Sequence, residues 1–375
     1  MKLPSLQESE QLYQKYPKYL KKQAINNLIL YDYLIPNWVM FRDDPLALNL
    51  RGIVFDRETT ELVSAPLFKF FNLNENPAVM ENNLKMSGIA VEKIDGSMAQ
   101  VTWWNGDLFV ASRGSMSDET GYVRPAVTRL INYKYTHLRE IITYNNHLTF
   151  IFEYLDPAHP IVITPTEEEL VLLAARNKIT GAVEYPRTDL GVRVPRSFRF
   201  APPDWEVMKD RLHNDKYSEG YVLHLDCGTW VKAKSLWYLR AHRVVTNLSE
   251  RSVVEAWADD KLDDVLSVAR EVNMDTTLIE VLAHKIETYL TTIISGYTNH
   301  YRNKPSLSIK DIALHMQEYP RPTPLCRWLF GTLMRHVRRG TPDEQLYEKL
   351  FIEIKKELVT NRDAVNCLLE EIGGP

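Results

Sequence analysis

The pattern of hydrophobic and polar residues changes character near residue 247. Before that point, short apolar or alternating runs are separated by Gly, Asn, Asp and Pro, as in strands joined by turns. After it, apolar residues recur at helical spacing over longer segments. The pattern therefore predicts an α+β protein, with a domain of antiparallel sheets over residues 1–245 and an all-helical domain over residues 246–375.

The same reading predicts the individual elements. In the first domain, residues 5–30 and two later insertions read as helical, Val123–Asn145 and Asp204–Asn214. Strands are predicted at Leu50–Phe55, Leu62–Phe70, Ile89–Val91, Met98–Trp104, Leu108–Ser112, Leu148–Tyr154, Val171–Ala175, Gly220–Leu225 and Thr229–Ala233. Helices of the second domain are predicted at Val253–Trp257, Leu262–Val272, Thr277–Ile294, Ile309–Gln317, Leu325–Val337, Asp343–Leu358 and Asp363–Ile372.

Composition limits the class of protein. A chain of 375 residues, 45% of them hydrophobic, is long enough to bury the cores of two domains. The three cysteines, Cys227, Cys326 and Cys367, are far apart and have no metal-binding spacing, which favours reduced thiols. The N-terminal segment has no apolar core of a signal peptide, and no apolar run reaches about 18 residues. We therefore expect a cytoplasmic protein without membrane-spanning segments.

Charge is distributed unevenly along the chain. The net charge of −4 argues against a generic nucleic-acid binder, but residues 300–340 carry eight Lys and Arg against two Asp and Glu. Arg335, Arg338 and Arg339 lie three and four positions apart, so they share one face of a helix that continues to Gly340. This basic face could hold RNA phosphates. The alternative is a solvated face whose arginines pair with the acidic segments on either side.

The stretch VEKIDGSMAQV, residues 91–101, contains the most informative chemistry. Lys93 lies on a glycine-permitted corner between two predicted strands, where its amine can face a pocket. By itself, Lys-x-Asp-Gly also fits an Asp-Gly hairpin turn with a solvated lysine. The choice between these interpretations depends on partners elsewhere in the chain.

Charged residues of other predicted strands are suitable partners for Lys93. Lys232 and Lys234 point to one face of a strand, where two ammonium groups are costly unless they meet an anion such as a triphosphate. Nearby cations also favour the neutral form of a lysine, which is the form that acts as a nucleophile. Glu153 and Glu219 suit a ribose hydroxyl or Mg²⁺. The set indicates attack of Lys93 on the α-phosphate of a nucleotide. Further cationic candidates are Arg51, Lys69 and Arg113.

The order of these motifs resembles a known superfamily. Lys-x-Asp-Gly followed by FEY, EGYV and Lys-x-Lys is similar to the covalent nucleotidyltransferases, which include ATP-dependent DNA and RNA ligases and mRNA capping enzymes. The segments LRGIVF, KFFNLNENP, EKIDGS, SRGS, EGYV, KAKSLWY and LFGTLM resemble the phage RNA ligase 1 family, the tRNA-repair ligases of T-even phages. The resemblance covers nearly the whole chain.

The resemblance implies a nucleotidyltransferase domain of the DNA and RNA ligase type and an ATP-dependent RNA ligase. Lys93 would take AMP and release pyrophosphate, AMP would pass to an RNA 5′-phosphate, and a 3′-hydroxyl would displace it. The cofactors would be ATP and Mg²⁺, with Mn²⁺ as an alternative ion. The RNA would present single-stranded ends or a nicked tRNA anticodon loop to a monomeric enzyme, in the cytoplasm of an infected cell if a phage encodes it.

The resemblance also implies residue roles. Glu153 would bind the ribose, Glu219 the metal, and Tyr31 would lie near the nucleotide, although Tyr31 equally fits core packing. Tyr238 falls at a family position needed for activity. Asp263 would be a metal ligand, with Asp264 or Asp259 as alternatives. Arg113 and Leu236 depart from the family pattern, where lysine and an acidic residue can occur. The residues implied to contact ATP phosphates are Arg51, Lys69, Lys232 and Lys234, and Arg113 joins the nucleotide-binding set.

Two rival functions stay open at this point. A DNA ligase or a GTP-using capping enzyme usually continues past Lys-x-Lys into a small β-barrel, whereas the pattern here continues as helices. A non-catalytic RNA-binding module would form no covalent nucleotide adduct. Labelling with ATP and GTP in parallel would separate these alternatives.

Overall fold

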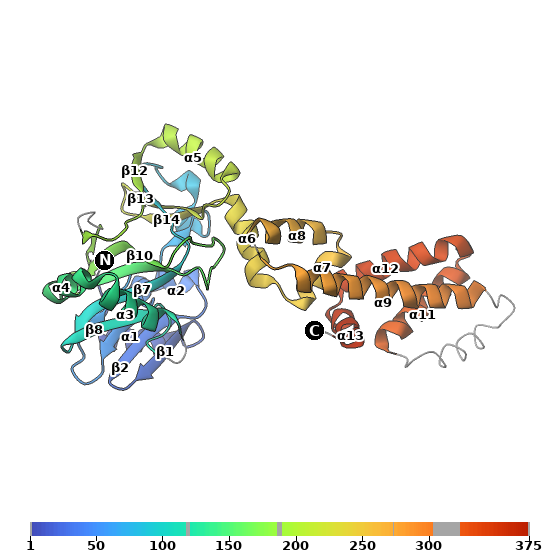
Figure 1. The fold of residues 1–375 in the computed structure, drawn as a ribbon, viewed down its shortest axis with the longest axis horizontal. Coiled ribbons are helices and arrows are strands. Elements are labelled where there is room, and N and C mark those ends of the chain that lie inside the picture. The colour runs from blue at the N-terminus through green and yellow to red at the C-terminus, as the bar shows by residue number, and fades with distance from the viewer. Residues whose placement is uncertain (1, 118–120, 186–189, 273, 303–322, 374–375) are drawn as a thin grey trace. The chain divides into compact units, whose positions relative to one another are not determined.

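The structure is a computed structural model that describes residues 2–117, 121–185, 190–272, 274–302 and 323–373. Contacts divide the chain into two compact units, Met1–Leu239 and Arg240–Pro375 (Figure 1). The division falls inside helix α6, Leu236–Asn247, which also contains the boundary predicted from the sequence.

The first sheet of the N-terminal unit is antiparallel, in the order β1-β2-β3-β4. The prediction of one helix over residues 5–30 is wrong beyond Lys15. Helix α1 starts at a capping box between Ser5 and Glu8, and Pro17 follows soon after it, where a helix cannot continue without losing a hydrogen bond. The next residues form a hairpin that turns at Asn26, whose φ is +52°. The elements are α1 (Leu6–Lys15), β1 (Leu20–Ile25), β2 (Leu28–Tyr33), α2 (Trp38–Asp43), η1 (Pro45–Asn49), β3 (Ile53–Asp56) and β4 (Leu62–Ser64).

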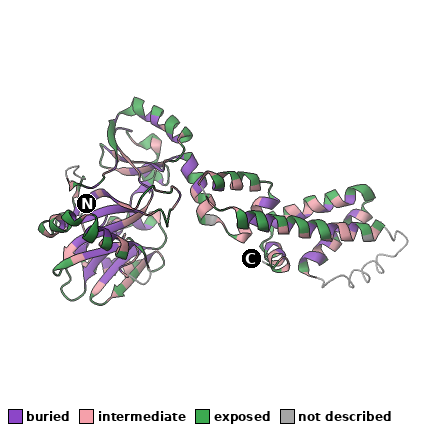
Figure 2. Cartoon of the chain, in the orientation of Figure 1, coloured by how far each residue is buried: buried purple, intermediate pink, exposed green. Residues whose placement is uncertain are grey.

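The second sheet has the order β11-β10-β9-β7-β8, and two helices pack on it. Their shared core contains Leu130 and Ile131 of α3, Ile142 of α4, and Val101 and Phe150 of the sheet. In Figure 2 the strands of this unit are largely purple, the colour of buried residues. All eight residues of β9 are buried, so this strand forms the centre of the unit. The elements are β7 (Ser97–Trp104), β8 (Asp107–Ser112), α3 (Val123–Tyr133), α4 (Thr136–Tyr144), β9 (Leu148–Leu155), β10 (Glu169–Asn177) and β11 (Val183–Glu184).

The third sheet has the order β12-β6-β13-β14-β5. Its strands pair antiparallel except β14 and β5, which pair in parallel. Helix α5 covers one face, because Trp205, Met208 and Leu212 join Leu223 and Val231 in one core (Figure 1). The elements are β5 (Phe71–Asn72), η2 (Pro77–Val79), η3 (Glu81–Asn83), β6 (Gly88–Glu92), β12 (Ser197–Phe200), α5 (Pro202–Asn214), β13 (Gly220–Leu225) and β14 (Trp230–Lys234).

The C-terminal unit is helical throughout its described residues. Apolar residues at helical spacing, such as Ile286 and Leu290 of α9, pack against Leu329 of α11 and Leu350 of α12. The predicted helix Ile309–Gln317 lies outside the described residues. The elements are α7 (Glu250–Ala258), α8 (Leu262–Glu271), α9 (Thr277–Arg302), α11 (Pro324–Arg338), η5 (Asp343–Gln345), α12 (Leu346–Thr360) and α13 (Arg362–Glu371).

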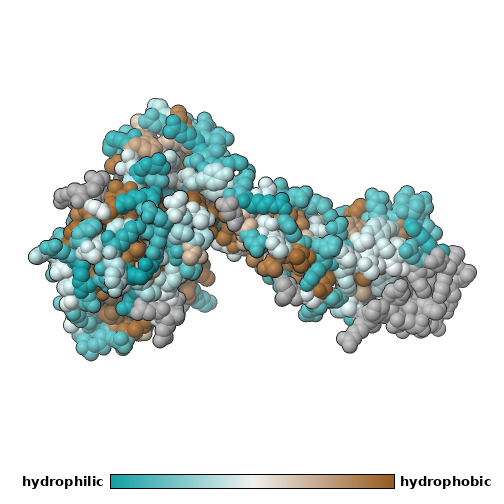
Figure 3. Space-filling model, in the orientation of Figure 1, coloured by the Kyte–Doolittle hydropathy of each residue, from teal (hydrophilic) through white to brown (hydrophobic). Residues whose placement is uncertain are grey.

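The predicted α+β class with antiparallel sheets and a helical C-terminal region is confirmed. The predicted strand Leu62–Phe70 is too long, because Pro66 has no N–H to continue the ladder and β4 ends at Ser64. Within the described ranges, no helix is long and apolar enough to cross a bilayer. On the face visible in Figure 3, hydrophobic residues form separate areas among hydrophilic ones.

Candidate active site

A cavity of about 520 Å³ opens in the N-terminal unit, a size that suits a small-molecule ligand. All three sheets contribute to its wall. Arg51 comes from the start of β3, Lys93 from the corner between β6 and β7, Glu153 from β9, and Val222 and Lys232 from β13 and β14. The cavity therefore brings together segments that lie up to about 180 residues apart in the sequence.

Lys93 lies on the corner between β6 and β7, which also contains Gly96. Its backbone N–H donates to the carbonyl of Gly220 at 2.9 Å, which ties the corner to β13. Gly96 packs so closely on β9 that a Cβ there would lie 2.6 Å from the carbonyl oxygen of Tyr154. The position of the lysine is thus set by two neighbouring strands rather than by its own turn.

The amine of Lys93 is held by Glu219. Its Nζ lies 2.8 Å from Oε2 of Glu219, and the other carboxylate oxygen lies 3.0 Å from Nζ of Lys234. Burial lowers the pKa of Lys93, but the charges of Glu219, Glu153 and Asp95 outweigh it, so the pKa is raised overall. In the protein without nucleotide, Lys93 is therefore a protonated, paired cation, which is the opposite of what a nucleophile needs.

Asp95 anchors the corner from its other side. One carboxylate oxygen accepts the backbone N–H groups of Val162 and Ile163 at 3.0 and 2.8 Å, and the other accepts the hydroxyl of Tyr238 at 2.7 Å. Tyr238 also lies beneath Lys234, whose Nζ is 4.8 Å from its ring centroid. The structure therefore gives Tyr238 a physical role: it connects the Lys-x-Asp-Gly corner to the end of the Lys-x-Lys strand.

Three cations, Arg51, Lys69 and Lys232, line the cavity or lie beside it. Burial, together with the charges of Arg51, Lys69 and Lys93, lowers the pKa of Lys232 to about 6. Lys69 is also buried, which lowers its pKa, and it lies 3.5 Å from Glu75. Among the described residues, Lys232 forms no ion pair. An anion bound here would pair with these cations and so offset the free-energy cost of burying their charges.

Arg113 and Glu153 complete the polar wall. Arg113 lines the cavity just after β8, with its guanidinium over the ring of Tyr33. Burial raises the pKa of Glu153 to about 7, although the nearby charge of Lys93 opposes this change. Near neutral pH the Glu153 carboxyl can therefore either donate or accept a hydrogen bond.

The part of the cavity wall that adjoins these cations is aromatic, which was not predicted from the sequence. The ring of His224 stacks on Trp230 with centroids 3.6 Å apart, and its Nδ1 lies 3.1 Å from the hydroxyl of Tyr185. Burial lowers the pKa of His224 to about 4, so the ring is neutral at physiological pH. The alternation of β13 and β14 contained this signal, because it places His224 on the face of Val222 and Trp230 on the face of Lys232.

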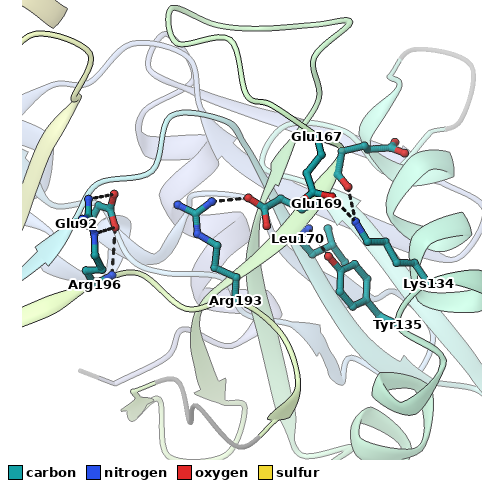
Figure 4. Close-up of polar contacts among 9 residues, drawn as sticks. Glu92, Lys134, Tyr135, Glu167, Glu169, Leu170, Arg193 and Arg196 are labelled. Carbon is teal, nitrogen blue, oxygen red and sulfur yellow. Dashed lines mark hydrogen bonds and ion pairs between the residues drawn. The ribbon is translucent and has the colours of Figure 1, made fainter.

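An ion pair lies at the cavity wall beside Lys93. Glu92, the residue before Lys93, lines the cavity and pairs with Arg196 (Figure 4). Figure 4 also shows the pairs of Arg193 with Glu169 of β10 and of Lys134, the cap residue after α3, with Glu167. Surface ion pairs of this kind usually contribute little to stability.

Some predicted site residues lie elsewhere. Tyr31 does not line the cavity, because its side chain is fully buried and packs against Phe55. Its hydroxyl donates a hydrogen bond to the carboxylate of Glu10. Asp263 is exposed in the first turn of α8, in the other unit. Across the described residues, no group of three or more His, Cys, Asp and Glu could hold a metal ion.

The basic face is only partly available. The guanidinium of Arg335 lies 3.4 Å from the carboxylate of Glu353. This contact agrees with the alternative interpretation, in which the arginines pair with the acidic segments on either side. Helix α11 ends at Arg338, and Arg339 is its cap residue with nearly helical angles. Within the described ranges, Arg338 and Arg339 are exposed and form no ion pair.

Comparison with known proteins decides the family. A family model for RNA ligase matches residues 49–238, the segment that contributes every cavity residue named above. The chain belongs to the RNA ligase family. The resemblance to that family predicted from its motifs is confirmed, and the protein is an enzyme of the ligase class.

Two sequence relatives agree with this family assignment. RNA ligase 1 of bacteriophage TS2126 is 29% identical over 238 residues, 59% of this chain and 58% of the relative, so less than two thirds of that protein is matched. A relative from Thermovibrio ammonificans is 28% identical over 264 residues, 67% of this chain and 68% of its own. An archaeal ATP-dependent RNA ligase of known structure has a TM-score of 0.45 at 14% identity, over 74% of this chain and 79% of that one.

Proposed function

We propose that this RNA ligase is ATP-dependent and joins a 5′-phosphate to a 3′-hydroxyl through an AMP adduct on Lys93. The observation that supports this most is the lining of the cavity, which brings the amine of Lys93 together with adjoining cationic and aromatic side chains. A purine would stack against the neutral rings of His224 and Trp230, and its phosphates would lie toward Lys232 and Arg51.

Glu219 controls the state of the nucleophile in this proposal. While it accepts from both Lys93 and Lys234, Lys93 stays protonated. If Glu219 turns to a divalent cation, burial and the charges of Lys232 and Lys234 favour the neutral amine of Lys93. The lone pair of Lys93 then forms the N–P bond to the α-phosphate, and pyrophosphate leaves with the electrons of the broken P–O bond.

A divalent cation fits this donor set. Mg²⁺ is usually held by one or two carboxylates together with substrate phosphates, and Glu219 and Glu153 are buried carboxylates beside Lys93. A third, Asp95, already accepts hydrogen bonds from Val162, Ile163 and Tyr238. When bound, the ion supplies positive charge to the phosphates. Mn²⁺ would suit the same oxygen ligands, and a contribution from Asp263 stays a prediction.

The two later steps use the same cations. The RNA 5′-phosphate attacks the phosphorus of the Lys93 adduct, so the N–P bond breaks and the lysine recovers its proton. The 3′-hydroxyl then attacks the adenylylated 5′-phosphate, and AMP leaves. In this proposal Arg51 and Arg113 hold the RNA phosphate during these steps, which their place in the lining of the same cavity as Lys93 supports.

The helical unit is proposed to contact the body of the RNA. Arg338 and Arg339 support this, since they are exposed and form no ion pair among the described residues. A nicked tRNA anticodon loop would use such contacts more than a short single strand. The natural RNA and the monomeric state also stay proposals.

The test is the mass of the purified protein after incubation with ATP and Mg²⁺. We expect one added AMP, none with Lys93→Ala, and none with GTP. Lys93→Ala should still join RNA that carries a preformed 5′-adenylate, because that step needs no lysine nucleophile. An AMP adduct on the Lys93→Ala protein would refute the assignment, and an adduct with GTP alone would favour a capping-type enzyme.

A further inference from the structure

The carboxylate of Asp32 is buried without a hydrogen bond. Asp32 lies on β2 with its side chain 0% exposed, and neither carboxylate oxygen accepts a hydrogen bond of normal geometry within the described residues. Burying an ionised carboxylate is expensive unless it is paired. Such a group in a native structure therefore calls for a physical explanation.

Two cations face Asp32. Nζ of Lys21, its cross-strand neighbour on β1, lies 3.8 Å from Oδ2, and Nε of Arg113 lies 3.3 Å from the same oxygen. Lys21 is also committed to another acceptor, because it donates to the carbonyl of Gly114 at 3.0 Å. Arg113 is therefore the nearest charge partner of the carboxylate.

The backbone of Arg113 is held in place. Ser112 and Ser115 close the turn around it, with the N–H of Ser112 donating to the carbonyl of Ser115 at 3.0 Å. Gly52 packs against Arg113 so closely that a Cβ on Gly52 would lie 2.4 Å from the Arg113 carbonyl oxygen. Gln100 donates to the carbonyls of both Gly52 and Ser112, at 2.8 and 3.1 Å. Only the side chain of Arg113 is left to be oriented.

Two adjacent residues of β2 orient that side chain. Asp32 approaches the guanidinium at Nε, and the ring of Tyr33 lies under its plane, 4.9 Å from Cζ. Tyr33 is itself fixed in the core by an edge contact with Phe41. A guanidinium held at Nε and stacked on a ring keeps its two terminal nitrogens for a second anion.

We propose that Asp32 is a positioning residue, which acts through Arg113 to present the guanidinium to a phosphate group in the cavity. This inference rests on the proposed function, in which Arg113 binds phosphate. The competing explanation is structural: Asp32 would only tie β2 to the turn after β8, with Lys21 as the bridge.

A double-mutant cycle separates these explanations, because it asks whether Asp32 matters once Arg113 is gone. The variants are Asp32→Asn, Arg113→Met and the two combined, in the full chain. Single-turnover formation of the AMP adduct is measured with labelled ATP and Mg²⁺, and thermal unfolding is measured beside it. We expect each single change to slow adduct formation on the order of 10- to 100-fold, since misplacement by about 1 Å has effects of this size. The double variant should be no slower than Arg113→Met alone.

A matched control uses an exposed ion pair of the same unit. Arg199 and Asp226 are 3.0 Å apart and do not line the cavity. The corresponding cycle, Arg199→Met and Asp226→Asn, should leave adduct formation unchanged. Arg113→Lys is a further variant, at a side chain that is 43% exposed. It retains the charge and leaves Asp32 intact, yet should still lose at least about 10-fold, because an ammonium has no planar fork.

The inference would be overturned by wild-type kinetics of Asp32→Asn, or by an equal loss from Asp32→Asn with and without Arg113. Wild-type kinetics of either Arg113→Met or Arg113→Lys would overturn it as well. Should Asp32→Asn fail to fold, the Arg113→Lys result decides alone. Failure of the proposed function is distinguishable from all of these, since the wild-type protein would then acquire no AMP.

Discussion

Replacing Glu219 by Gln should lower the pKa of Lys93. The change keeps the size of the side chain but removes the negative charge that lies 2.8 Å from Nζ of Lys93 and 3.0 Å from Nζ of Lys234. Burial then favours the neutral amine, opposed by the remaining charges of Glu153 and Asp95, which are smaller contributions than that of Glu219. The sign is therefore fixed: a pKa that the wild-type site raises should fall.

The size of this shift follows from the geometry. A pair of unit charges at this separation, in the effective dielectric of a partly buried site, is worth about 6 kcal/mol. Lys234 shares the carboxylate and Lys93 is 21% exposed, so part of this energy is screened. We expect the remaining part to appear as a lower pKa of Lys93 in the variant than in the wild-type protein.

The assay reads Lys93 directly in the protein without nucleotide. An amine-reactive label is applied briefly across a pH series, and modification of the Lys93 peptide is measured by mass spectrometry. Because only the neutral amine reacts, the midpoint of labelling reports the pKa. Glu92→Gln is the matched control, since Glu92 lies next to Lys93 in the sequence but pairs with Arg196. It should leave the midpoint in place.

The outcome that would refute the reasoning is a midpoint that stays or rises in Glu219→Gln. Labelling must be confined to folded protein, because an unfolded lysine would titrate at its ordinary pKa. The Lys93–Glu219 pair should stabilise the fold fully at neutral pH. That contribution should disappear as pH rises through the raised pKa of Lys93.

Three further predictions concern other parts of the molecule. Alanine at either lysine of the Lys-x-Lys pair should slow AMP-adduct formation about 10²–10³-fold, and a wild-type rate would remove this strand face from the phosphate site. Gly96→Ala should destabilise the protein by about 1–3 kcal/mol and slow adduct formation, whereas Gly106→Ala, where a Cβ meets nothing within 4 Å, should leave the rate unchanged; rate and thermal unfolding check both. Removing the charges of Arg338 and Arg339 should weaken joining of a nicked stem-loop and flatten its salt dependence by about one unit of slope per charge. The matched Arg335→Ala should instead lower thermal stability, because Arg335 pairs with Glu353.

Local patterns in the sequence were sufficient where chemistry and periodicity coincide. The alternation in β14 correctly predicted that Lys232 and Lys234 share a face, opposite the buried Val231 and Ala233. The same alternation places His224 on the face of Val222 and Trp230 on the face of Lys232, but no motif marks these two residues as part of a cavity. For Tyr31 the sequence left a nucleotide contact and core packing equally open, and in the structure its side chain is buried in the core.

The sequence by itself determined the family, the order of the motifs and the change from sheets to helices, because these depend on residue type and short-range spacing. Only the tertiary structure decided which charges meet. Glu219 lies 126 residues after Lys93 and binds its amine, and Arg113 lies 81 residues after Asp32 and faces its carboxylate. Burial and pairing set the pKa of each group, and both arise from long-range packing that no local pattern contains. For that reason the sequence predicted a lysine with a lowered pKa, whereas the folded protein without nucleotide holds it protonated against Glu219.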